Sequence, residues 1–539
     1  MGVKFLDSLD DVTGDVEQKD WRGGADEFLS PTELPPNTGG RLINCVVEDN
    51  GRPRTRPGAD ALGGAALAAA RIEALTYFDT PSTEQVFASI NATLQSWSGS
   101  AWSEIADYPF GANSIAAMAQ GHDKLYCSDS SNQWQSWDGS AWSGALGSGV
   151  NDPPVGATIM VWHTALNRMF ASGAINGQYD ALYASVLDPA SAGGGKWSNA
   201  NWCVRIGRGE GERITAVVPG KGFWLAIGKE GSIFMVYADP AANSAADWLI
   251  PRLAGSVGCV GKHAMVAVGD SLFVIGPDLA LREIVPTGAA VQAGDAPFEL
   301  LPPASEPAAP YFARINTAAQ DKIVLWKYGR YLLAALPLDS ATEPSHVLVW
   351  NLRLRRLAEV PGATIPAFIG VWTGWTPTAF CTSRFAGVEQ LLIGEDDGYV
   401  NEWKDREDQD LDDTYTDNDV NVLATIRSRS WDFGTQRNTK DAESVEGQFV
   451  SSTAAVDILA VMDDVEQARW SESLQVTQNE LPLTLPFDLA VLGPSTKTRN
   501  ADELIEFREM YVEIEQTGLG KVELKSLAAA AFLNTIDNE

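Results

Sequence analysis

The sequence predicts an all-β protein whose largest part is a β-propeller of six or seven blades. Short apolar runs alternate with clusters of Gly, Asp, Asn and Ser, a pattern typical of successive β-hairpins. Of the 18 tryptophans, all but Trp21, Trp431 and Trp470 lie between residues 97 and 403. The phrase SWSGSAW at residues 96–102 returns as SWDGSAW at residues 136–142. A repeat of about 40 to 50 residues with four short strands is the signature of a propeller blade.

Closure of these repeats into a ring follows from burial. A single four-stranded blade cannot bury both of its faces, whereas a ring of blades leaves only short edges. Tryptophan suits the wedge between blades because it is large and flat and has one N–H to satisfy. The repeated phrase is therefore predicted to be a strand–turn–strand corner in two successive blades. The predicted units begin near Ile72, Ser114, Ala157, Glu212, Gly258, Asp321 and Thr376.

The number of blades depends on the segment 286–320, which contains LPPASEPAAPY and is rich in Pro and Ala. We expect this segment to be an inter-blade loop or an insertion. Seven units is the preferred count, and six remains open.

The propeller is assigned to residues 72–404, with different compositions on either side. Residues 1–71 are rich in Gly, Pro, Asp and Glu and predict an extended arm with a β-hairpin, in which INCVV and RPRTRPG flank the turn EDNG. Residues 405–420 are dense in Asp and predict an exposed acidic linker. Apolar alternation resumes in residues 421–539, which predicts a C-terminal β-sandwich or jelly roll.

The charge of the chain restricts its partners. With 39 basic and 71 acidic residues among 539, the net charge is -32. Such a surface repels nucleic-acid phosphate and anionic lipid, which argues against a protein that reads DNA or lies on a membrane. No apolar run is long enough to span a bilayer, and the N-terminal residues lack the apolar core of a signal peptide, so we expect a soluble protein made in the cytoplasm.

Cysteine and histidine usage argues against an enzyme, a metal site or a bound cofactor. The five cysteines are isolated and form no C-x-x-C pair, which predicts separate buried thiols, although one disulfide stays open. Only four histidines occur, none close to another, and histidine is the usual general acid or base and the commonest metal ligand. We therefore expect no catalytic, cofactor-binding or metal-binding residues.

Several motifs resemble functional sites but are better explained as turns. The phrase SWDGSAW is close to the Asp box of sialidase-like propellers but fails its spacing. Glu395, Asp396 and Asp397 are candidates for the carboxylate pair of a glycosidase, although sequence cannot show that any two face a pocket. The acidic tract 405–419 lacks the calcium-loop pattern, and the glycines of GRGEGERI and GGGKW lack the phosphate-loop pattern.

One basic cluster, RPRTRPG at residues 52–58, stands out in the acidic chain. Arg52, Arg54 and Arg56 could contact carboxylates of a neighbouring acidic subunit. The alternative is a solvated hairpin edge guarded by charge.

Three stretches resemble a known family. GGRLINCVVEDNGRPRTRPGADAL is similar to the N-terminal signature of virion proteins from short-tailed bacteriophages, with Asn44, Gly51, Arg56, Pro57 and Gly58 in the matching places. Gly258 and Cys259 occupy the Gly-Cys position of a blade in residues 255–284, and NELPLTLPFDLAVLG resembles a part of the family's distal β domain. The chain thus resembles the tail hub or nozzle proteins of the packaged-DNA stabilisation type.

The resemblance implies a structural virion protein without catalysis. Such proteins form a hexameric ring in the phage tail, assembled in the host cytoplasm, which continues the DNA channel below the portal and adaptor and retains the genome until ejection. The implied partners are further copies of the chain, the portal-adaptor, other tail proteins including tail fibres, and double-stranded DNA that passes without sequence recognition. An acidic lumen would let DNA slide. Two alternatives stay open: a host-receptor or carbohydrate-binding propeller, and a propeller glycosidase.

Overall fold

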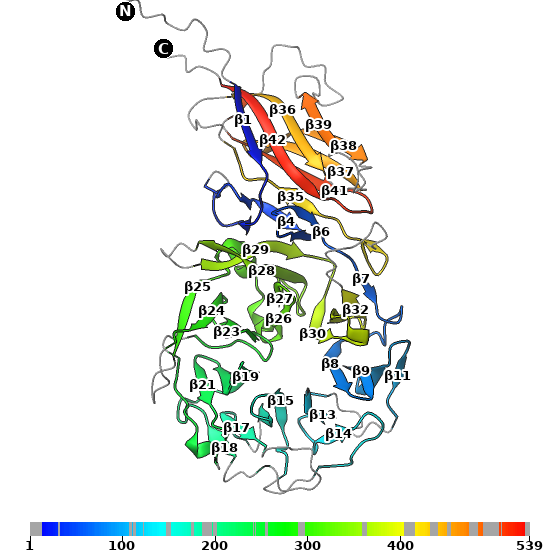
Figure 1. Ribbon diagram of the computed structural model, residues 1–539, viewed down its shortest axis with the longest axis vertical. Helices are drawn as coiled ribbons and strands as arrows, with labels where there is room; N and C mark the ends of the chain where they lie inside the picture. The colour runs from blue at the N-terminus through cyan, green and yellow to red at the C-terminus, as the bar shows by residue number, and fades with distance from the viewer. Residues whose placement is uncertain are drawn as a thin grey trace, which may run out of the picture.

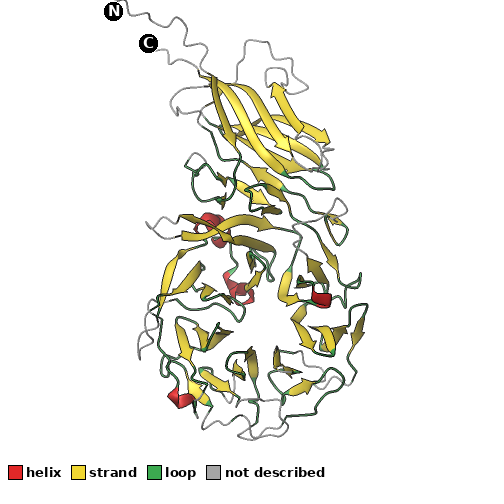
Figure 2. Cartoon of the chain, in the orientation of Figure 1, coloured by secondary structure: helices red, strands yellow, loops and turns green. Residues whose placement is uncertain are grey.

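The computed structural model describes residues 13–533 with gaps, and it is built almost entirely of strands (Figures 1 and 2). The helices in this part of the chain are short: η1 (Ala245–Asp247), η2 (Glu306–Ala308), α1 (Ala309–Phe312), η3 (Thr317–Lys322) and η4 (Phe385–Gly387). None of them is long and apolar enough to cross a membrane. The gaps are residues 31–32, 107–109, 111–114, 122, 147–151, 174–176, 186–196, 198–201, 241, 243, 254–256, 289–296, 358–363, 404–414, 432–439, 450–453, 474–482, 489–505 and 508.

Successive antiparallel sheets are arranged radially around an axis, which is the β-propeller arrangement (Figure 1). The first sheets contain β8 (Ile72–Thr80), β9 (Thr83–Ile90), β10 (Thr93–Trp97) and β11 (Trp102–Glu104); β12 (Ala117–Gly121), β13 (Lys124–Ser128) and β14 (Gln135–Trp137); β15 (Ala157–His163), β16 (Arg168–Gly173), β17 (Ala181–Ala184) and β18 (Cys203–Arg205); and β19 (Ile214–Pro219), β20 (Trp224–Lys229) and β21 (Ile233–Tyr237).

The following sheets complete the circle. They contain β22 (Met265–Val268), β23 (Ser271–Ile275), β24 (Leu281–Pro286) and β25 (Phe298–Pro303); β26 (Val324–Tyr328), β27 (Tyr331–Leu336), β28 (His346–Leu357) and β29 (Thr364–Trp372); and β30 (Pro377–Ser383), β31 (Gln390–Glu395) and β32 (Val400–Trp403). The innermost strand of each sheet contacts that of the next, and β30 of the last sheet lies beside β8 of the first. The first strands begin within about seven residues of the predicted unit starts.

The N-terminal arm closes the ring. Strand β7 (Ala59–Ala61) precedes the first sheet in sequence but pairs with β32 as the outermost strand of the last sheet. The register joins Ala61 to Asn401 and Ala59 to Trp403. Because the two ends of the circle share one sheet, opening the ring requires the loss of these strand pairs.

The same arm joins the propeller to the C-terminal part of the chain. Strand β4 (Arg41–Ile43) pairs with β29 on one side and with β35 (Thr425–Arg427) on the other. The sheet then continues through β41 (Met510–Gln516), β37 (Ala455–Met462) and β38 (Val465–Ser473). A second C-terminal sheet has the order β1 (Thr13–Gln18), β42 (Leu524–Leu533), β36 (Lys440–Phe449) and β39 (Leu483–Asp488), with β40 (Glu506–Phe507) also on β36.

Small strand pairs complete the arm and the segment after the propeller. Strands β5 (Cys45–Val47) and β6 (Pro53–Thr55) pair antiparallel, so the predicted hairpin around EDNG is confirmed. Strands β2 (Gly24–Ala25) and β3 (Thr38–Gly39) pair in parallel. Strands β33 (Thr416–Asp417) and β34 (Val420–Asn421) form a short hairpin after the last propeller sheet.

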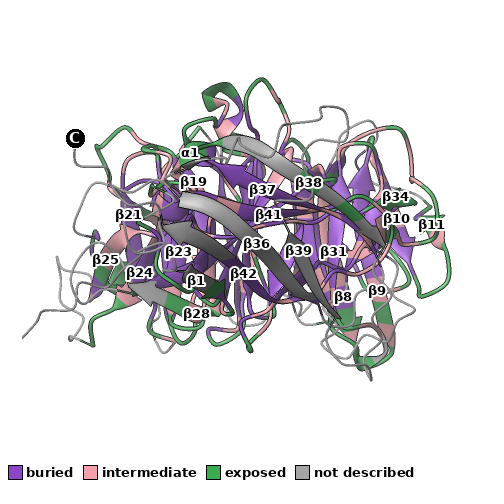
Figure 3. Cartoon of the chain, turned by 90° about the horizontal axis from the view of Figure 1, so that it is seen from above, coloured by how far each residue is buried: buried purple, intermediate pink, exposed green. Residues whose placement is uncertain are grey.

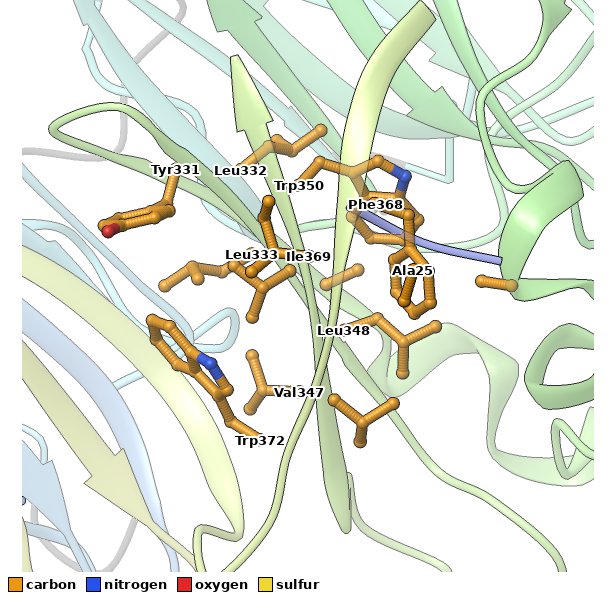
Figure 4. Packing of buried hydrophobic residues seen from close by; sticks show 14 of the residues in the cluster. Ala25, Tyr331, Leu332, Leu333, Val347, Leu348, Trp350, Phe368, Ile369 and Trp372 are labelled. Atoms are coloured by element: carbon orange, nitrogen blue, oxygen red, sulfur yellow. The ribbon is translucent and has the colours of Figure 1, made fainter. Parts of the chain in front are cut away.

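One apolar cluster runs from the propeller through the arm into the C-terminal sheets. Trp350, Phe368 and Trp372 are fully buried; Trp350 and Phe368 lie beside the arm residue Ala25, whereas Trp372 lies apart from it and packs against Tyr331 (Figure 4). The same cluster includes Leu42 of β4 and Ile514 of β41. Figure 3 shows buried residues along β37 and β41 and along the propeller strands. The continuous core and the shared sheet indicate that the two parts pack as one body.

The repeated phrase forms the corner that the sequence predicted. Trp97 and Trp102 pair across β10 and β11, with ring centroids 5.7 Å apart. Trp137 and Trp142 form the equivalent bridge in the next sheet, at 5.5 Å. In the second copy, the Asp138 carboxylate accepts hydrogen bonds from the amides of residues 140 and 141 at 2.9 and 2.8 Å, which caps the turn.

The segment 286–320 differs from the loop or insertion that we expected. Strand β25 lies within it and forms the outer edge of its sheet, paired with β24. The short helices that follow bury Tyr311 and Phe312 in the main core. The run FELLPP gave a weak strand signal because proline is unfavourable in strands, yet proline is tolerated on an edge strand.

Candidate functional site

The predicted arginine cluster lies at the junction of the arm, the last propeller sheet and the C-terminal sheets. Arg56 is fully buried, and its guanidinium forms a bidentate ion pair with the Asp417 carboxylate of β33. It also donates to the carbonyl oxygens of Pro57 at 3.0 Å and Thr373 at 2.8 Å. A buried guanidinium with this many acceptors is satisfied, so it acts as a fixed bridge between three segments.

Aromatic rings surround this ion pair. The Arg56 guanidinium lies 4.3 Å from the centroid of the Trp375 ring, a cation–π contact. The indole nitrogen of Trp403 donates to the Pro57 carbonyl at 3.0 Å, and that of Trp372 donates to the Cys45 carbonyl at 2.8 Å. The late tryptophans of the propeller are therefore used to hold the arm in place.

Asn44 is the second centre of the junction; the sequence placed it in the family signature but did not show its structural role. Its φ of 50° places it in the left-handed region, which asparagine tolerates better than most residues. Its side chain accepts from the Thr373 amide at 2.8 Å and donates to the Leu423 carbonyl at 3.0 Å. Asn44 thus connects the arm to the end of β29 and to the chain leading into β35.

The other two arginines of the cluster also have partners within the chain. Arg54 is buried and pairs with Glu48, and Arg330 of the propeller approaches the same carboxylate at 3.3 Å. Burial opposes ionisation of Glu48, but the two arginines outweigh it and lower the pKa of the carboxyl. Arg52 lies 3.5 Å from Glu523 with its side chain 32% exposed. Of the three arginines, Arg52 is therefore the one exposed enough to contact another subunit.

The structure corrects part of the prediction that residues 405–420 form an exposed acidic linker. Residues 404–414 lie outside the described residues, but the end of the tract is ordered and Asp417 is buried against Arg56. The expectation of a solvated tract is therefore wrong for Asp417. The sequence could not show which carboxylate of the acidic tract pairs with a buried arginine, because Arg56 and Asp417 are about 360 residues apart.

The three glycosidase candidates lie close to this junction. Glu395 is buried, and burial together with the nearby charge of Asp397 raises its pKa to about 8. Asp396 accepts from the Thr376 hydroxyl at 2.6 Å, and Asp397 accepts from the Tyr399 amide at 3.3 Å. Asp397 therefore caps the turn between β31 and β32, and Asp396 connects this turn to the residue that precedes β30.

The remaining candidates for chemistry are metal-ligating side chains and the cysteine thiols. Among the described residues, no group of three or more His, Cys, Asp or Glu side chains is arranged to hold a metal ion. The five cysteines are free, and four of them are buried. Burial raises the pKa of the Cys259 and Cys381 thiols to about 12, which keeps them protonated and unreactive. GGGKW lies largely outside the described residues.

A second polar cluster, which we call the axial mouth, consists of Arg71, Lys262, His263, Lys322 and Glu343. Four of these residues lie in segments that lead into innermost strands, and Glu343 lies between β27 and β28. Lys262 donates to the Ala116 carbonyl at 2.6 Å. Ala116 and Lys262 precede β12 and β22, in sheets on opposite sides of the ring, so this bond spans the axial entrance (Figure 1).

No family model matches the sequence, and no curated protein matches it either. Solved structures with similar folds include YCF48 bound to D1 peptide, at 10% identity over 65% of this chain and 98% of that chain, with a TM-score of 0.39. BBS1N in complex with ARL6DN has 12% identity over 66% and 99%, with a TM-score of 0.41. The Swd1 β-propeller domain of Myceliophteria thermophila has 9% identity over 64% and 99%, with a TM-score of 0.39. The β-propeller is evident from the chain's own strand pairing.

Proposed function

We propose that this chain is a structural subunit of a short-tailed phage tail, a hub or nozzle protein that forms a hexameric ring around the DNA path. The observation that carries the proposal is the threading of the arm through the whole molecule. Within residues 13–61, β1 pairs with the C-terminal sheet, β4 joins two sheets, and β7 closes the propeller. Such cross-linking removes the hinge between the two parts, which suits a subunit that must bear load.

In finer detail, we propose a propeller of seven blades followed by a C-terminal β-sandwich. The support for seven blades is the number of radial sheets between Ile72 and Trp403, with β7 included in the last. The support for a sandwich is a core shared by residues of both C-terminal sheets, for example Ile458 of β37 and Leu527 of β42.

The charge of the chain supports a role around DNA that avoids adhesion to it. A ring of subunits that each carry a net charge of -32 repels phosphate, so the duplex would slide along the lumen without sequence recognition. The portal-adaptor and the other tail proteins remain the proposed partners, with the virion tail as the proposed location. No cofactor, metal or catalysis is part of the proposal.

The carbohydrate-binding alternative depended on exposed tryptophans. Trp97 and Trp137 are buried, and their partners Trp102 and Trp142 are half-buried with their rings packed against them, so none of the four presents an open face for stacking a sugar. The glycosidase alternative depended on a carboxylate pair, but Glu395 is buried, and the neighbouring Asp396 and Asp397 accept hydrogen bonds from Thr376 and Tyr399. Neither alternative gains a supporting observation, so both rank below the structural role.

The oligomeric state of the purified chain tests the proposal. Mass photometry should show a species of about 347 kDa, six times the chain mass of 57.9 kDa, either alone or with the adaptor ring added. Antibody labelling of intact virions should place the chain on the tail axis. A chain that stays monomeric with the adaptor present and is absent from virions would contradict the proposal, whereas saturable binding to a glycan array would favour the receptor-binding alternative.

A further inference from the structure

Exposed apolar side chains gather beside the junction. In the part of the chain that the structure describes, eight large apolar side chains are exposed, and three of them lie here: Val420 at 69%, Leu519 at 56% and Leu423 at 43%. Single exposed apolar residues are ordinary on a protein surface, whereas a contiguous group marks an interaction surface. Together with Arg52 and Lys521, these three residues form what we call the junction face.

Hydrogen bonds bring the segments of the junction face together. Leu423 precedes Ala424, whose carbonyl accepts from the Gln516 amide at 2.8 Å. Leu519 follows in the loop between β41 and β42, and Val420 lies in β34, three residues before Leu423. The β33–β34 hairpin and this loop both lie where the propeller meets the C-terminal sheets (Figure 1). The three apolar side chains therefore belong to one region of the surface.

Buried side chains hold the segments that carry Val420 and Leu423. The Asp417 carboxylate, in the same hairpin as Val420, is paired with the buried Arg56. The side-chain amide of Asn44 donates to the Leu423 carbonyl at 3.0 Å. These two exposed side chains are thus presented by backbone that is fixed from below.

The loop that carries Leu519 is held in a similar way. The side-chain amide of the buried Gln516 donates to the carbonyl oxygens of residues 518 and 520, both at 2.8 Å. The side-chain oxygen of Gln516 accepts from the hydroxyl of the buried Thr55 at 2.8 Å. Because a surface on fixed backbone loses little conformational entropy when it binds, the junction face is suited to a stable contact.

The junction face lacks the acidic excess of the rest of the chain. Arg52 Nη1 lies 3.5 Å from Glu523 Oε1 and Lys521 Nζ lies 2.9 Å from Glu523 Oε2, so two cations share this carboxylate. The exposed Asp419 carries the opposite sign, but its φ of 68° in the hairpin turn is a conformation that aspartate tolerates. Copies of a chain with a net charge of -32 repel one another, so they associate best where a surface without acidic excess meets an acidic one.

We infer that the junction face is the surface through which one copy of the chain contacts the next. The inference rests on the hexameric ring proposed above and names the part of the subunit that builds it. Because a closed ring uses two different surfaces of each subunit, the junction face meets an acidic surface of the neighbour. Arg52 pairs with a carboxylate of that surface, and the three apolar side chains are removed from water.

Mass photometry of the full-length chain over a range of concentrations, with and without the adaptor ring, tests the inference. We expect Val420→Asp and Leu519→Asp to raise the concentration needed for half-assembly by about tenfold or more, because each places a carboxylate in an apolar contact. Arg52→Glu should weaken assembly in the same direction, because it reverses a charge at the contact. The thermal midpoints of Val420→Asp and Leu519→Asp should stay near that of wild type, since both side chains are exposed.

Phe223→Asp is the matched control, because Phe223 is 51% exposed in the turn between β19 and β20, in a propeller sheet remote from the junction (Figure 1). Its assembly should equal that of wild type. If wild type forms hexamers and Val420→Asp and Leu519→Asp form them equally well, the inference is overturned while the ring stands. An equal loss in Phe223→Asp, or hexamers of the variants that fail only to bind the adaptor, overturns it too. A wild-type chain that stays monomeric with the adaptor present contradicts the ring itself, and the inference with it.

Discussion

At the residue scale, Arg56 is the side chain on which the junction depends most. Replacing it with methionine leaves the Asp417 carboxylate buried without its counter-charge, which costs about 3–5 kcal/mol of unfolding free energy. Denaturant unfolding measures the loss. Arg353→Met is the control, because Arg353 is 64% exposed and its pair with Asp49 contributes about 0–1 kcal/mol. A loss from Arg56→Met as small as that of the control would show that the ion pair is not structural.

Glu395 gives the junction a pH dependence with a definite sign. Burial raises its pKa from 4.5 to about 8, so the folded chain holds a proton that the unfolded chain releases. Between about pH 4.5 and pH 8 the folded state binds more protons, and the contribution of this group to stability falls as pH rises. Below pH 4.5 both states are protonated and the difference vanishes.

The corresponding variant is Glu395→Gln, which mimics the neutral carboxyl at every pH. We expect its thermal midpoint to exceed that of wild type at pH 8.5 and to match it near pH 4.5. Glu104→Gln, at an exposed position of β11, should show no such trend. If the thermal midpoints of Glu395→Gln and wild type differed by the same amount from pH 4.5 to pH 8.5, burial would not raise the pKa of Glu395.

At the element scale, the sequence predicted the repeating units well and their connections poorly. Alternating apolar runs and turn residues placed the first strand of each sheet near its observed start, and the Trp corners at residues 96–102 and 136–142 formed as expected. The closing strand β7 and the bridging strand β4 have three residues each, which is too few to show the apolar–polar alternation that predicts a strand. Their partners are hundreds of residues away, so only tertiary packing reveals them.

The candidate site was predictable to a similar degree. The basic cluster drew attention to Arg56, but sequence could not show that its partner is Asp417 rather than another subunit. Asn44 was matched to a family pattern, and its left-handed backbone explains why asparagine suits that place. The axial mouth was missed because its residues come from segments scattered between positions 71 and 343 and share no local pattern.

The join between the two parts can be tested through Gly370 of β29. Its φ is 126°, and a Cβ there would overlap the carbonyl oxygen of Leu42 in β4. Gly370→Ala should therefore lower the thermal midpoint and separate the unfolding of the two parts in calorimetry. Gly387→Ala is the control, because Gly387 also has a positive φ of 78° but nothing near its added Cβ, so only about 1 kcal/mol of backbone strain is expected. Equal effects of the two variants would argue against a tight join.

At the scale of the whole molecule, the net charge of -32 should make stability depend on salt. Self-repulsion among carboxylates destabilises the compact state, and added salt screens it over about 10 Å at 0.1 M. The thermal midpoint should rise between low salt and roughly 0.3 M sodium chloride. A midpoint that falls with salt would show instead that the surface ion pairs outweigh the repulsion.

The most direct measurement of the central claim is a cryo-electron-microscopy reconstruction of the chain in assembled tails. The account predicts a closed six-fold ring in which each subunit keeps its propeller and C-terminal sheets as one rigid body, with carboxylates lining the lumen. A lumen lined by lysine and arginine, or a chain found only as a peripheral monomer, would contradict it.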